Sequence, residues 1–222
     1  MISIERQQGL FIAISKRLKK KISVYSVGGT AMMLLGLKDS TLDIDLVFET
    51  AEERKIFIEA IKSLGYEGMD AAIVYGAKSN KPEMLTLGEE RFDLFLDEVV
   101  DFLFSESMRE RAGQTHQFGE TLVLKTANPN DILLMKCATD RLKDLDDARK
   151  IIENIKVDWN LVVEEAKNQK KLRKEKAIFE LGYFLEKLKN KFKLNIPKKI
   201  LDELWDLLKE EPKKKTRGKK PE

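Results

Sequence analysis

Val27-Gly28-Gly29-Thr30 and, shortly after it, Thr41-Leu42-Asp43-Ile44-Asp45-Leu46 are the stretches of this chain that decide its fold and its chemistry. Apolar residues occupy every second position from 42 to 48, which is the period of a strand with one buried face. Asp43 and Asp45 therefore point to the same side of that strand. Their Cα atoms lie roughly 6.5–7 Å apart, close enough for both carboxylates to bind one magnesium ion or to bridge two.

The glycine pair stands between a predicted strand over residues 22–27 and a predicted helix over residues 30–35. Gly28 and Gly29 can adopt backbone angles that are closed to other residues. The free N–H groups at the start of a helix bind phosphate oxygens, so we expect Gly28, Gly29 and Thr30 to hold phosphate groups. The structural alternative is an ordinary strand-to-helix turn, followed by aspartates that only occupy the solvent face of an edge strand.

A third acidic group is expected near bound metal ions, either as a ligand or as the base that takes a proton from an attacking hydroxyl. Asp93 is the first candidate, because it lies in an alternating strand over residues 91–97 that follows a turn at 87–90. Asp97 lies on the same face further along and is the reserve candidate. The alternative is that Asp93 is an ordinary exposed strand residue.

These residues resemble a known group of enzymes. The glycine turn at 28–30, the Asp43-x-Asp45 pair and a later strand carboxylate look like the nucleotidyltransferase superfamily typified by DNA polymerase beta. The stretch from Ile132 to Asp147 is similar to the Lys…Arg-x-Lys-Asp-x-x-Asp segment of the AbiEii-like nucleotidyltransferases, which include toxins of type IV toxin–antitoxin systems. The resemblance covers roughly residues 20–155. It implies an NTP substrate and Mg²⁺, or alternatively Mn²⁺, bound by Asp43, Asp45 and Asp93.

The same resemblance assigns roles to residues of the later segment. It implies that Lys136 contacts nucleotide phosphates and that the Lys143–Asp144 pair completes the active site, with Lys143 on the nucleotide. The segment also has a purely structural interpretation, because Asn128 and Pro129 are typical of a helix start. In one unbroken helix, Lys136, Asp140 and Asp144 would share a face and form only surface ion pairs.

One position departs from the family pattern. Such proteins often carry an arginine two residues before the Ser/Thr of the x-Asp-x-Asp motif, and here Asp39 stands two residues before Thr41. Lys38 is next to it, and a shifted loop would let Lys38 bind the triphosphate together with Thr41. The departure bears on which NTP the protein prefers.

The pattern of elements indicates strands and helices followed by a helical segment, and the resemblance implies the α+β class: a nucleotidyltransferase-fold mixed β-sheet flanked by helices and followed by a C-terminal helical bundle. We expect a catalytic core over residues 1–126, a helical part over residues 127–211 that packs against it, and a disordered basic tail over residues 212–222. The predicted core elements are helices at 4–20, 30–35, 51–64 and 105–111, and strands at 22–27, 42–48, 84–87, 91–100, 114–118 and 121–124. From Asn128 onwards the pattern is helical, with a last helix starting at Asn195.

Composition excludes several kinds of site and compartment. The single cysteine, Cys137, lies among apolar helix residues and argues against disulfides and thiolate metal sites. The single histidine, His116, lacks partners for a zinc site or a Ser-His-Asp triad and is expected in a loop or strand. No apolar run is long enough to span a membrane and the N-terminus lacks a signal-peptide pattern, so we expect a cytoplasmic protein without membrane contact.

Charge is divided unevenly along the chain. Residues 1–166 carry 22 Lys/Arg against 29 Asp/Glu, whereas residues 167–200 carry 12 against 3. A basic region beside an acidic metal site suits a polyanionic acceptor such as tRNA, although lysine-rich helices are often only solubilising.

Three hypotheses follow. The first is a toxin-like enzyme that transfers an NMP to RNA, at a tRNA 3′ end, with an antitoxin protein as partner. The second is transfer to a small molecule such as an aminoglycoside, or to a protein hydroxyl, which predicts an acidic or apolar acceptor cleft. The third is a non-catalytic nucleotide-binding or interaction protein with the same fold.

Overall fold

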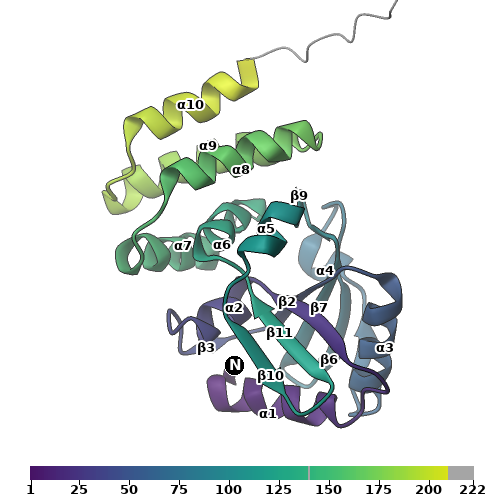
Figure 1. The fold of residues 1–222 in the computed structure, drawn as a ribbon. Helices are drawn as coiled ribbons and strands as arrows, with labels where there is room; N and C mark the ends of the chain where they lie inside the picture. Colours follow the sequence, from purple (N-terminus) through teal and green to yellow (C-terminus); the bar gives the residue numbers. More distant parts are fainter. Residues whose placement is uncertain (140, 210–222) are drawn as a thin grey trace, which may run out of the picture.

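A nine-stranded mixed sheet forms the centre of the molecule in the computed structural model, which describes residues 1–139 and 141–209 (Figure 1). The main path of the sheet runs in the order β10 (Thr115–Phe118), β11 (Leu122–Thr126), β2 (Ile22–Ser26), β4 (Ile44–Phe48), β7 (Glu90–Leu96), β6 (Glu83–Leu87) and β5 (Glu67–Met69). The short strands β8 (Glu98–Val99) and β9 (Phe102–Leu103) extend from the end of β7. The pairs β11–β2 and β4–β7 are parallel, and the other pairs are antiparallel.

The two faces of the sheet have separate cores. Helices α1 (Ile4–Ser15) and α3 (Ala51–Lys62) cover one face, where Ile44, Leu46 and Phe48 of β4 are fully buried. Asp45 and Val47, the alternate residues of the same strand, therefore lie on the opposite face, and Val47 belongs to the second core. This is the alternation predicted from the sequence, except that Leu42 lies before the strand and is half exposed.

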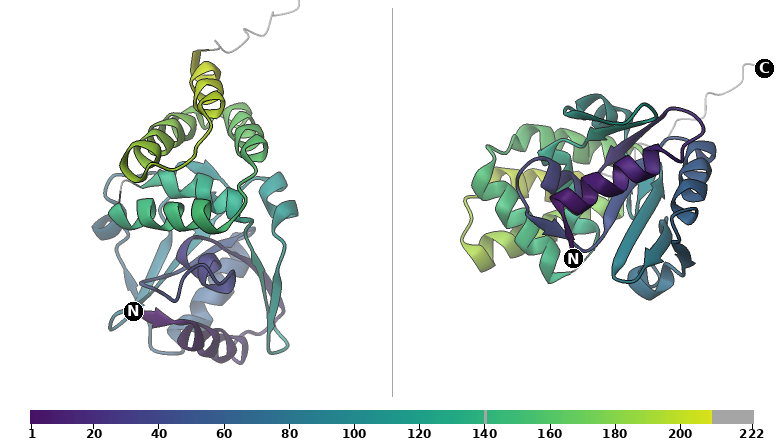
Figure 2. Two further views of the ribbon diagram at one scale, coloured as in Figure 1. Left: turned by 90° about the vertical axis from the view of Figure 1, so that its left-hand side faces the viewer. Right: turned by 90° about the horizontal axis from the view of Figure 1, so that it is seen from below.

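The second face carries α2 (Gly28–Leu34) and the helices that follow the sheet. These helices are α6 (Pro129–Met135), the short 3-10 helix η1 (Lys136–Ala138), α7 (Leu142–Asn154), α8 (Trp159–Lys171), α9 (Glu175–Phe192) and α10 (Lys198–Lys209). One continuous apolar core joins Val47 and Phe95 of the sheet to Leu181 of α9 and Leu204 of α10. Figure 2 shows α8–α10 on the far side of α6 and α7 from the N-terminal helix α1.

The α+β class with a mixed sheet and C-terminal helices is thus confirmed. The predicted division at residue 126 stays a prediction. The predicted basic tail at 212–222 and the last two residues of the predicted helical part lie outside the described residues.

The helical segment after residue 128 is interrupted where the sequence allowed an unbroken helix. Asn128 accepts a hydrogen bond from the backbone N–H of Asn130, and Pro129 begins α6 as expected. After η1, Thr139 adopts an extended backbone (φ −131°, ψ 142°), so the chain changes direction before α7. The structural alternative, in which an unbroken helix places Lys136, Asp140 and Asp144 on one face, therefore does not hold for Lys136 and Asp144, and Asp140 lies outside the described residues.

Smaller differences from the predicted elements have local causes. Helix α1 ends at Ser15 and not at residue 20, and α10 begins at Lys198, after Pro197, and not at Asn195. Helix α5 (Glu106–Arg111) is capped by Ser105, as its sequence predicts. The strand predicted over 91–100 is divided at Asp97 into β7 and β8. The pair β1 (Ile2–Ser3) with β3 (Ser40–Thr41), the strands β5 and β9 and the short helix α4 (Ala72–Tyr75) were not predicted, because they are too short to show a period. No helix of the described residues has the length and apolarity to cross a membrane.

Candidate active site

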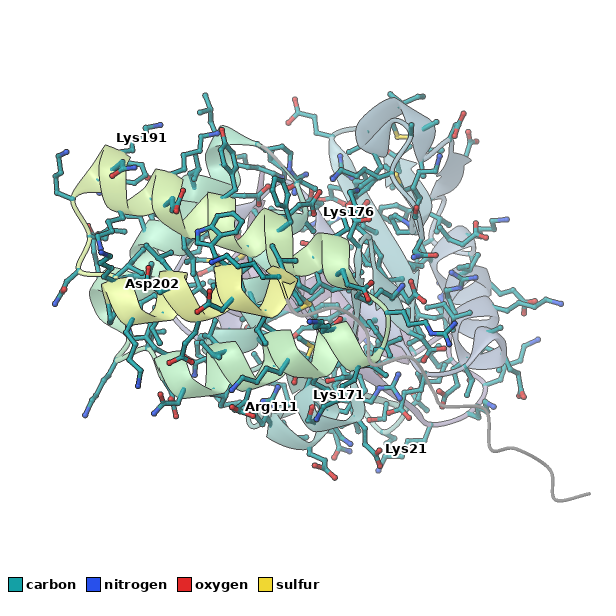
Figure 3. The ribbon with its side chains drawn as sticks, turned by 90° about the horizontal axis from the view of Figure 1, so that it is seen from above. Lys21, Arg111, Lys171, Lys176, Lys191 and Asp202 are labelled. Atoms are coloured by element: carbon teal, nitrogen blue, oxygen red, sulfur yellow. The ribbon has the colours of Figure 1, made fainter. Side chains whose placement is uncertain are left out.

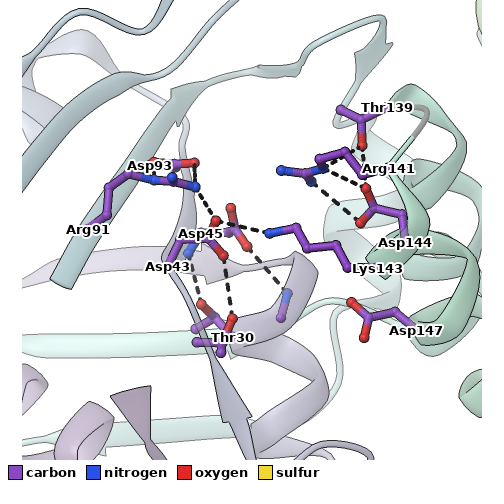
Figure 4. Close-up of polar contacts among 12 residues, drawn as sticks. Thr30, Asp43, Asp45, Arg91, Asp93, Thr139, Arg141, Lys143, Asp144 and Asp147 are labelled. Atoms are coloured by element: carbon purple, nitrogen blue, oxygen red, sulfur yellow. Dashed lines mark hydrogen bonds and ion pairs between the residues drawn. The ribbon is translucent and has the colours of Figure 1, made fainter. Parts of the chain in front are cut away.

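Three aspartates meet at the ends of two neighbouring parallel strands. Asp45 of β4 and Asp93 of β7 are register partners, and Asp43 lies directly before β4 (Figure 4). One carboxylate oxygen from each residue can be chosen so that all three lie within 4.8 Å of one another. Asp43 and Asp93 are buried, and Asp45 is partly exposed. The structure therefore brings together the three residues that the sequence proposed as metal ligands.

The glycine turn packs directly against this cluster. Gly28 has a left-handed backbone (φ +55°), and a Cβ atom there would overlap the carboxylate of Asp45. The N–H of Gly29 donates to Asp45 Oδ2 at 3.3 Å, and the backbone N–H of Asp45 donates to Thr30 Oγ1 at 2.8 Å. Helix α2 begins at Gly28, two residues earlier than predicted. The glycines are thus required for close packing on Asp45, in addition to any contact with phosphate.

Two basic side chains reach Asp43 from opposite sides. Arg91 of β7 contacts Asp43 and also donates from Nε to Asp93 Oδ1 at 2.8 Å. Lys143 of α7 lies 3.3 Å from Asp43 Oδ2. Burial opposes ionisation of Asp43, but the charges of Lys143 and Arg91 outweigh it and hold the pKa of Asp43 below its usual range. Asp43 is therefore an anion over the whole neutral range.

Asp45 and Asp93 behave in the opposite way. Burial, together with the negative charges of Asp43 and Asp93, raises the pKa of Asp45 to about 7. Burial also raises the pKa of Asp93, in spite of the opposing charge of Arg91, and Asp43 contributes further. Crowded carboxylates with raised pKa values are a donor set that a hard divalent cation would stabilise, because its charge relieves their repulsion. The residues present thus fit a magnesium or manganese ion.

Lys136 and Asp144 are brought together by the chain break between α6 and α7. Lys136 is buried (8% exposed) and donates to Asp144 Oδ1 at 3.0 Å and to Asp147 Oδ2 at 2.6 Å. Burial disfavours its charge, but Asp144 and Asp147 outweigh this and raise the pKa of Lys136. Arg141 Nε also donates to Asp144, at 2.8 Å. The pair is therefore part of a buried ionic network and not a surface ion pair.

Lys38 and Thr41 lie on the other side of the glycine turn. Lys38 forms an ion pair with Asp147, with Nζ at 2.8 and 3.0 Å from the two carboxylate oxygens. Thr41 Oγ1 donates to Asp43 Oδ1 at 3.4 Å and occupies the space where a Cβ on Gly29 would stand. Asp39, at the place where the family pattern has arginine, is exposed to solvent.

Asp97, the reserve candidate for the third carboxylate, lies outside the cluster. Its backbone is left-handed (φ +55°), directly after the end of β7, and this turn removes it from the alternation of the strand. Its carboxylate accepts a hydrogen bond from Arg109 at 2.7 Å. The expectation that Asp97 shares the face of Asp93 is wrong for this reason. His116 lies in β10, as expected of a strand residue.

A pocket opens beside the aspartates, with about 470 Å³ of free space including its mouth. Its polar side carries Gly28, Asp45, Lys136, Arg141 and Asp144. Its apolar side consists of side chains from the loop and strands next to Asp93 and from α6: Tyr75, Phe95, Val99, Val100, Ile132 and Met135.

Sequence reasoning missed four residues of this site. Arg91 had a signal, since it lies two residues before Asp93 on the same strand face. Arg141 and Asp147 belong to the segment that carries the resemblance, but neither received a role. Tyr75 gave no signal: it ends the short helix α4, and its hydroxyl donates to Asp93 Oδ2 at 2.7 Å.

Comparisons with known proteins give one family match and a few matches to solved structures. No curated protein matches the chain. The solved structures that match include a crystal structure of ANT(2")-Ia in complex with adenylyl-2"-tobramycin, with 16% sequence identity and a TM-score of 0.44, over 82% of this chain and 98% of that chain. Residues 10–193 match the family described as "Nucleotidyltransferase of unknown function (DUF6036)", which is most of the chain. The protein therefore belongs to this nucleotidyltransferase family, and is a transferase of that class.

Proposed function

We propose that the protein transfers an NMP from an NTP to an acceptor hydroxyl in a magnesium-dependent reaction, with release of pyrophosphate. The observation that carries the proposal is the cluster of Asp43, Asp45 and Asp93 directly against the glycine turn. A divalent cation held by these three carboxylates would neutralise the triphosphate and lower the pKa of the acceptor hydroxyl. Manganese accepts the same oxygen ligands and is the alternative ion.

The residues around the glycine turn bind the nucleotide. Gly28, Gly29 and Thr30 bind phosphate oxygens at the start of α2, and Thr41 stands beside them. Lys38, Lys136 and Lys143 supply the positive charge, which stabilises pyrophosphate as it leaves. Asp144 keeps Lys136 charged and fixed in the buried network.

Asp93 acts on the acceptor, as the general base. Its raised pKa makes it a stronger base than an ordinary aspartate for the proton of the acceptor hydroxyl. The alternative of a non-catalytic binding protein depends on Asp39. The amine of Lys38, which lies 4.0 Å from the position of a Cβ atom on Gly29, supports the catalytic proposal against it.

RNA is the first acceptor that we propose, with the tRNA 3′ end as the site of transfer in the cytoplasm. Lysines are frequent after residue 166, and Figure 3 labels Lys171 of α8 and Lys176 and Lys191 of α9. Residues 167–200 carry 12 Lys/Arg against 3 Asp/Glu, which suits a polyanion. The resemblance to AbiEii-like toxins supports the same acceptor, and an antitoxin protein would then be the partner.

A small molecule or a protein hydroxyl is the second acceptor that a specific observation favours. The pocket beside Asp93 has an apolar side formed by Phe95, Val99 and Val100, where an apolar or aromatic part of an acceptor would be shielded from water. The opposite side carries Lys136 and Arg141 together with Asp45 and Asp144, so the polar groups of an acceptor would meet charges of both signs there.

The test is transfer of label from each labelled NTP, with Mg²⁺, to total tRNA. We expect label in RNA from the wild-type protein and none from an Asp43→Ala/Asp45→Ala variant. Label that appears only in protein or in an added small hydroxyl compound would support the second acceptor. Absence of NTP binding and of transfer to any acceptor would refute the proposed function.

A further inference from the structure

A buried carboxylate of α7 joins two lysines from distant segments. Asp147 is 3% exposed and accepts hydrogen bonds from Lys38 at 2.8 and 3.0 Å and from Lys136 at 2.6 Å. Lys38 precedes β3, and Lys136 begins η1, almost a hundred residues later in the chain. Asp147 therefore fixes the two amines close to each other.

Both lysines border the glycine turn. Lys38 Nζ is 4.0 Å from the position that a Cβ atom would take on Gly29. Lys136 lines the pocket that also contains Gly28 and Asp45. The two amines, held together by Asp147, thus lie beside the glycine turn and next to the aspartate cluster.

The two lysines depend on Asp147 to different degrees. Lys136 has a second carboxylate, Asp144, at 3.0 Å. The ion pair of Lys38 is with Asp147 alone among the described residues. A lysine amine sits on a flexible chain with four carbons, so its position is set by its partner. Removal of the Asp147 charge would release Lys38 and leave Lys136 held by Asp144.

We propose that Asp147 is a positioning residue that holds Lys38 beside the glycine turn, next to Lys136, so that both amines contact the phosphate groups of an NTP. The inference rests on the proposed function. It extends that function because Asp147 acts through the lysines and does not itself touch substrate.

The test compares the affinity for magnesium tripolyphosphate, for an NTP and for the matching nucleoside, measured by titration calorimetry. We expect Asp147→Asn and Lys38→Met each to lower the polyphosphate and NTP affinities about ten-fold, the size of a lost charged hydrogen bond. The double variant should bind no more weakly than the single variants, because both remove the same contact. Nucleoside affinity should not change.

Asp146→Asn is the matched control. Asp146 is the neighbouring residue of α7, it loses the same charge, and its carboxylate pairs with Arg149 at the surface. Asp147→Glu keeps the charge but moves the carboxylate, so it covers the case in which Asp147→Asn does not fold; its affinity for tripolyphosphate should fall several-fold.

The outcomes separate the two proposals. Wild-type binding of polyphosphate with unchanged binding by Asp147→Asn, or by Asp147→Glu where the former does not fold, would overturn the inference alone. Equal losses for NTP and nucleoside, or additive losses in the double variant, would also overturn it, since they indicate a general structural role. A wild-type protein that binds no polyphosphate would overturn the proposed function together with the inference.

Discussion

Asp45 and Asp93 are register partners on adjacent parallel strands, and both carboxylates face the helices that follow the sheet. The register places two acidic side chains side by side, and Asp43 adds a third from the end of the loop before β4. Such a cluster is unfavourable without a counter-ion, because burial and like charge both oppose ionisation. The raised pKa values of Asp45 and Asp93 reflect this unfavourable free energy of ionisation.

Asp93→Asn should abolish transfer, whereas Asp97→Asn should leave it intact. Asp93 is fully buried within the cluster, and Asp97 pairs with Arg109 outside it. We expect the rate to fall at least about 100-fold for Asp93→Asn, the usual effect of losing a general base. Steady-state assays of pyrophosphate release would measure both variants. Equal losses of rate in the two variants would indicate that the loss comes from disturbed folding and not from removal of the base.

Divalent metal affinity should rise with pH until about pH 7 and then level off. The pKa of Asp45 is about 7, so below that pH a proton competes with the metal for this carboxylate. The affinity should fall roughly ten-fold for each pH unit below the pKa of a single competing group. Titration with Mn²⁺ between pH 5.5 and 8.5, followed by electron paramagnetic resonance, would test this. A flat profile would contradict it.

Asp45→Asn should stabilise the metal-free protein at alkaline pH. The folded pKa of Asp45 is raised from its ordinary value of 3.8 to about 7. Protonated Asp45 therefore stabilises the folded state. This contribution is fully present below the unfolded pKa and is lost as the pH rises through 7. Replacement by a neutral amide removes the loss, so we expect a gain of roughly 1–3 kcal/mol at pH 8. Urea denaturation at pH 5 and pH 8 would measure it. A loss at pH 8 would argue against charge crowding.

Tyr75→Phe should slow transfer while nucleotide binding stays normal. The change removes the hydroxyl that donates to Asp93 but keeps the ring, which packs edge-on against Phe95. We expect about a ten-fold lower kcat with little change of KM, because one hydrogen bond to a charged group is lost. Tyr75→Ala should in addition destabilise the fold by about 3–5 kcal/mol, through loss of a buried aromatic ring. Tyr75→Phe with wild-type kcat would show that the hydroxyl has no role in positioning Asp93.

Lys136→Met should impair folding before it informs on catalysis. Lys136 bridges two buried carboxylates, Asp144 and Asp147, which would then keep only one cationic partner each, Arg141 and Lys38. Breaking a buried pair in this way costs about 3–5 kcal/mol. Chemical denaturation of the variant should show the loss. A fully stable Lys136→Met protein would indicate that Arg141 and Lys38 are sufficient to neutralise the two carboxylates.

The sequence predicted most of the site because its parts lie on regular elements. The period of two placed Asp43 and Asp45 on one side of the strand, and it placed Asp93 on another alternating strand. The pattern alone did not reveal that β4 and β7 are neighbours, since strand pairing is a long-range property. It also did not reveal the backbone turn that removes Asp97, because nothing in its sequence marks a left-handed residue there.

The contacts of α7 were beyond sequence reasoning for a different reason. An ideal helix through residues 136–144 would have placed Lys136 and Asp144 two turns apart. The break at Thr139 folds the chain back, so the two side chains meet and Asp147 joins them. Interruptions of this kind depend on tertiary packing, which overrides local helix propensity.

Because Gly28 packs against Asp45, the glycine turn and the aspartate segment can change in sequence only together. A side chain at position 28 would enter the space of the Asp45 carboxylate, and a side chain at 29 would enter that of Thr41. Substitution of either glycine should therefore be tolerated only together with a shift of the opposite residue. Searches for related enzymes, and attempts to transplant this site to another scaffold, should treat residues 28–30 and 41–45 as a single inseparable block.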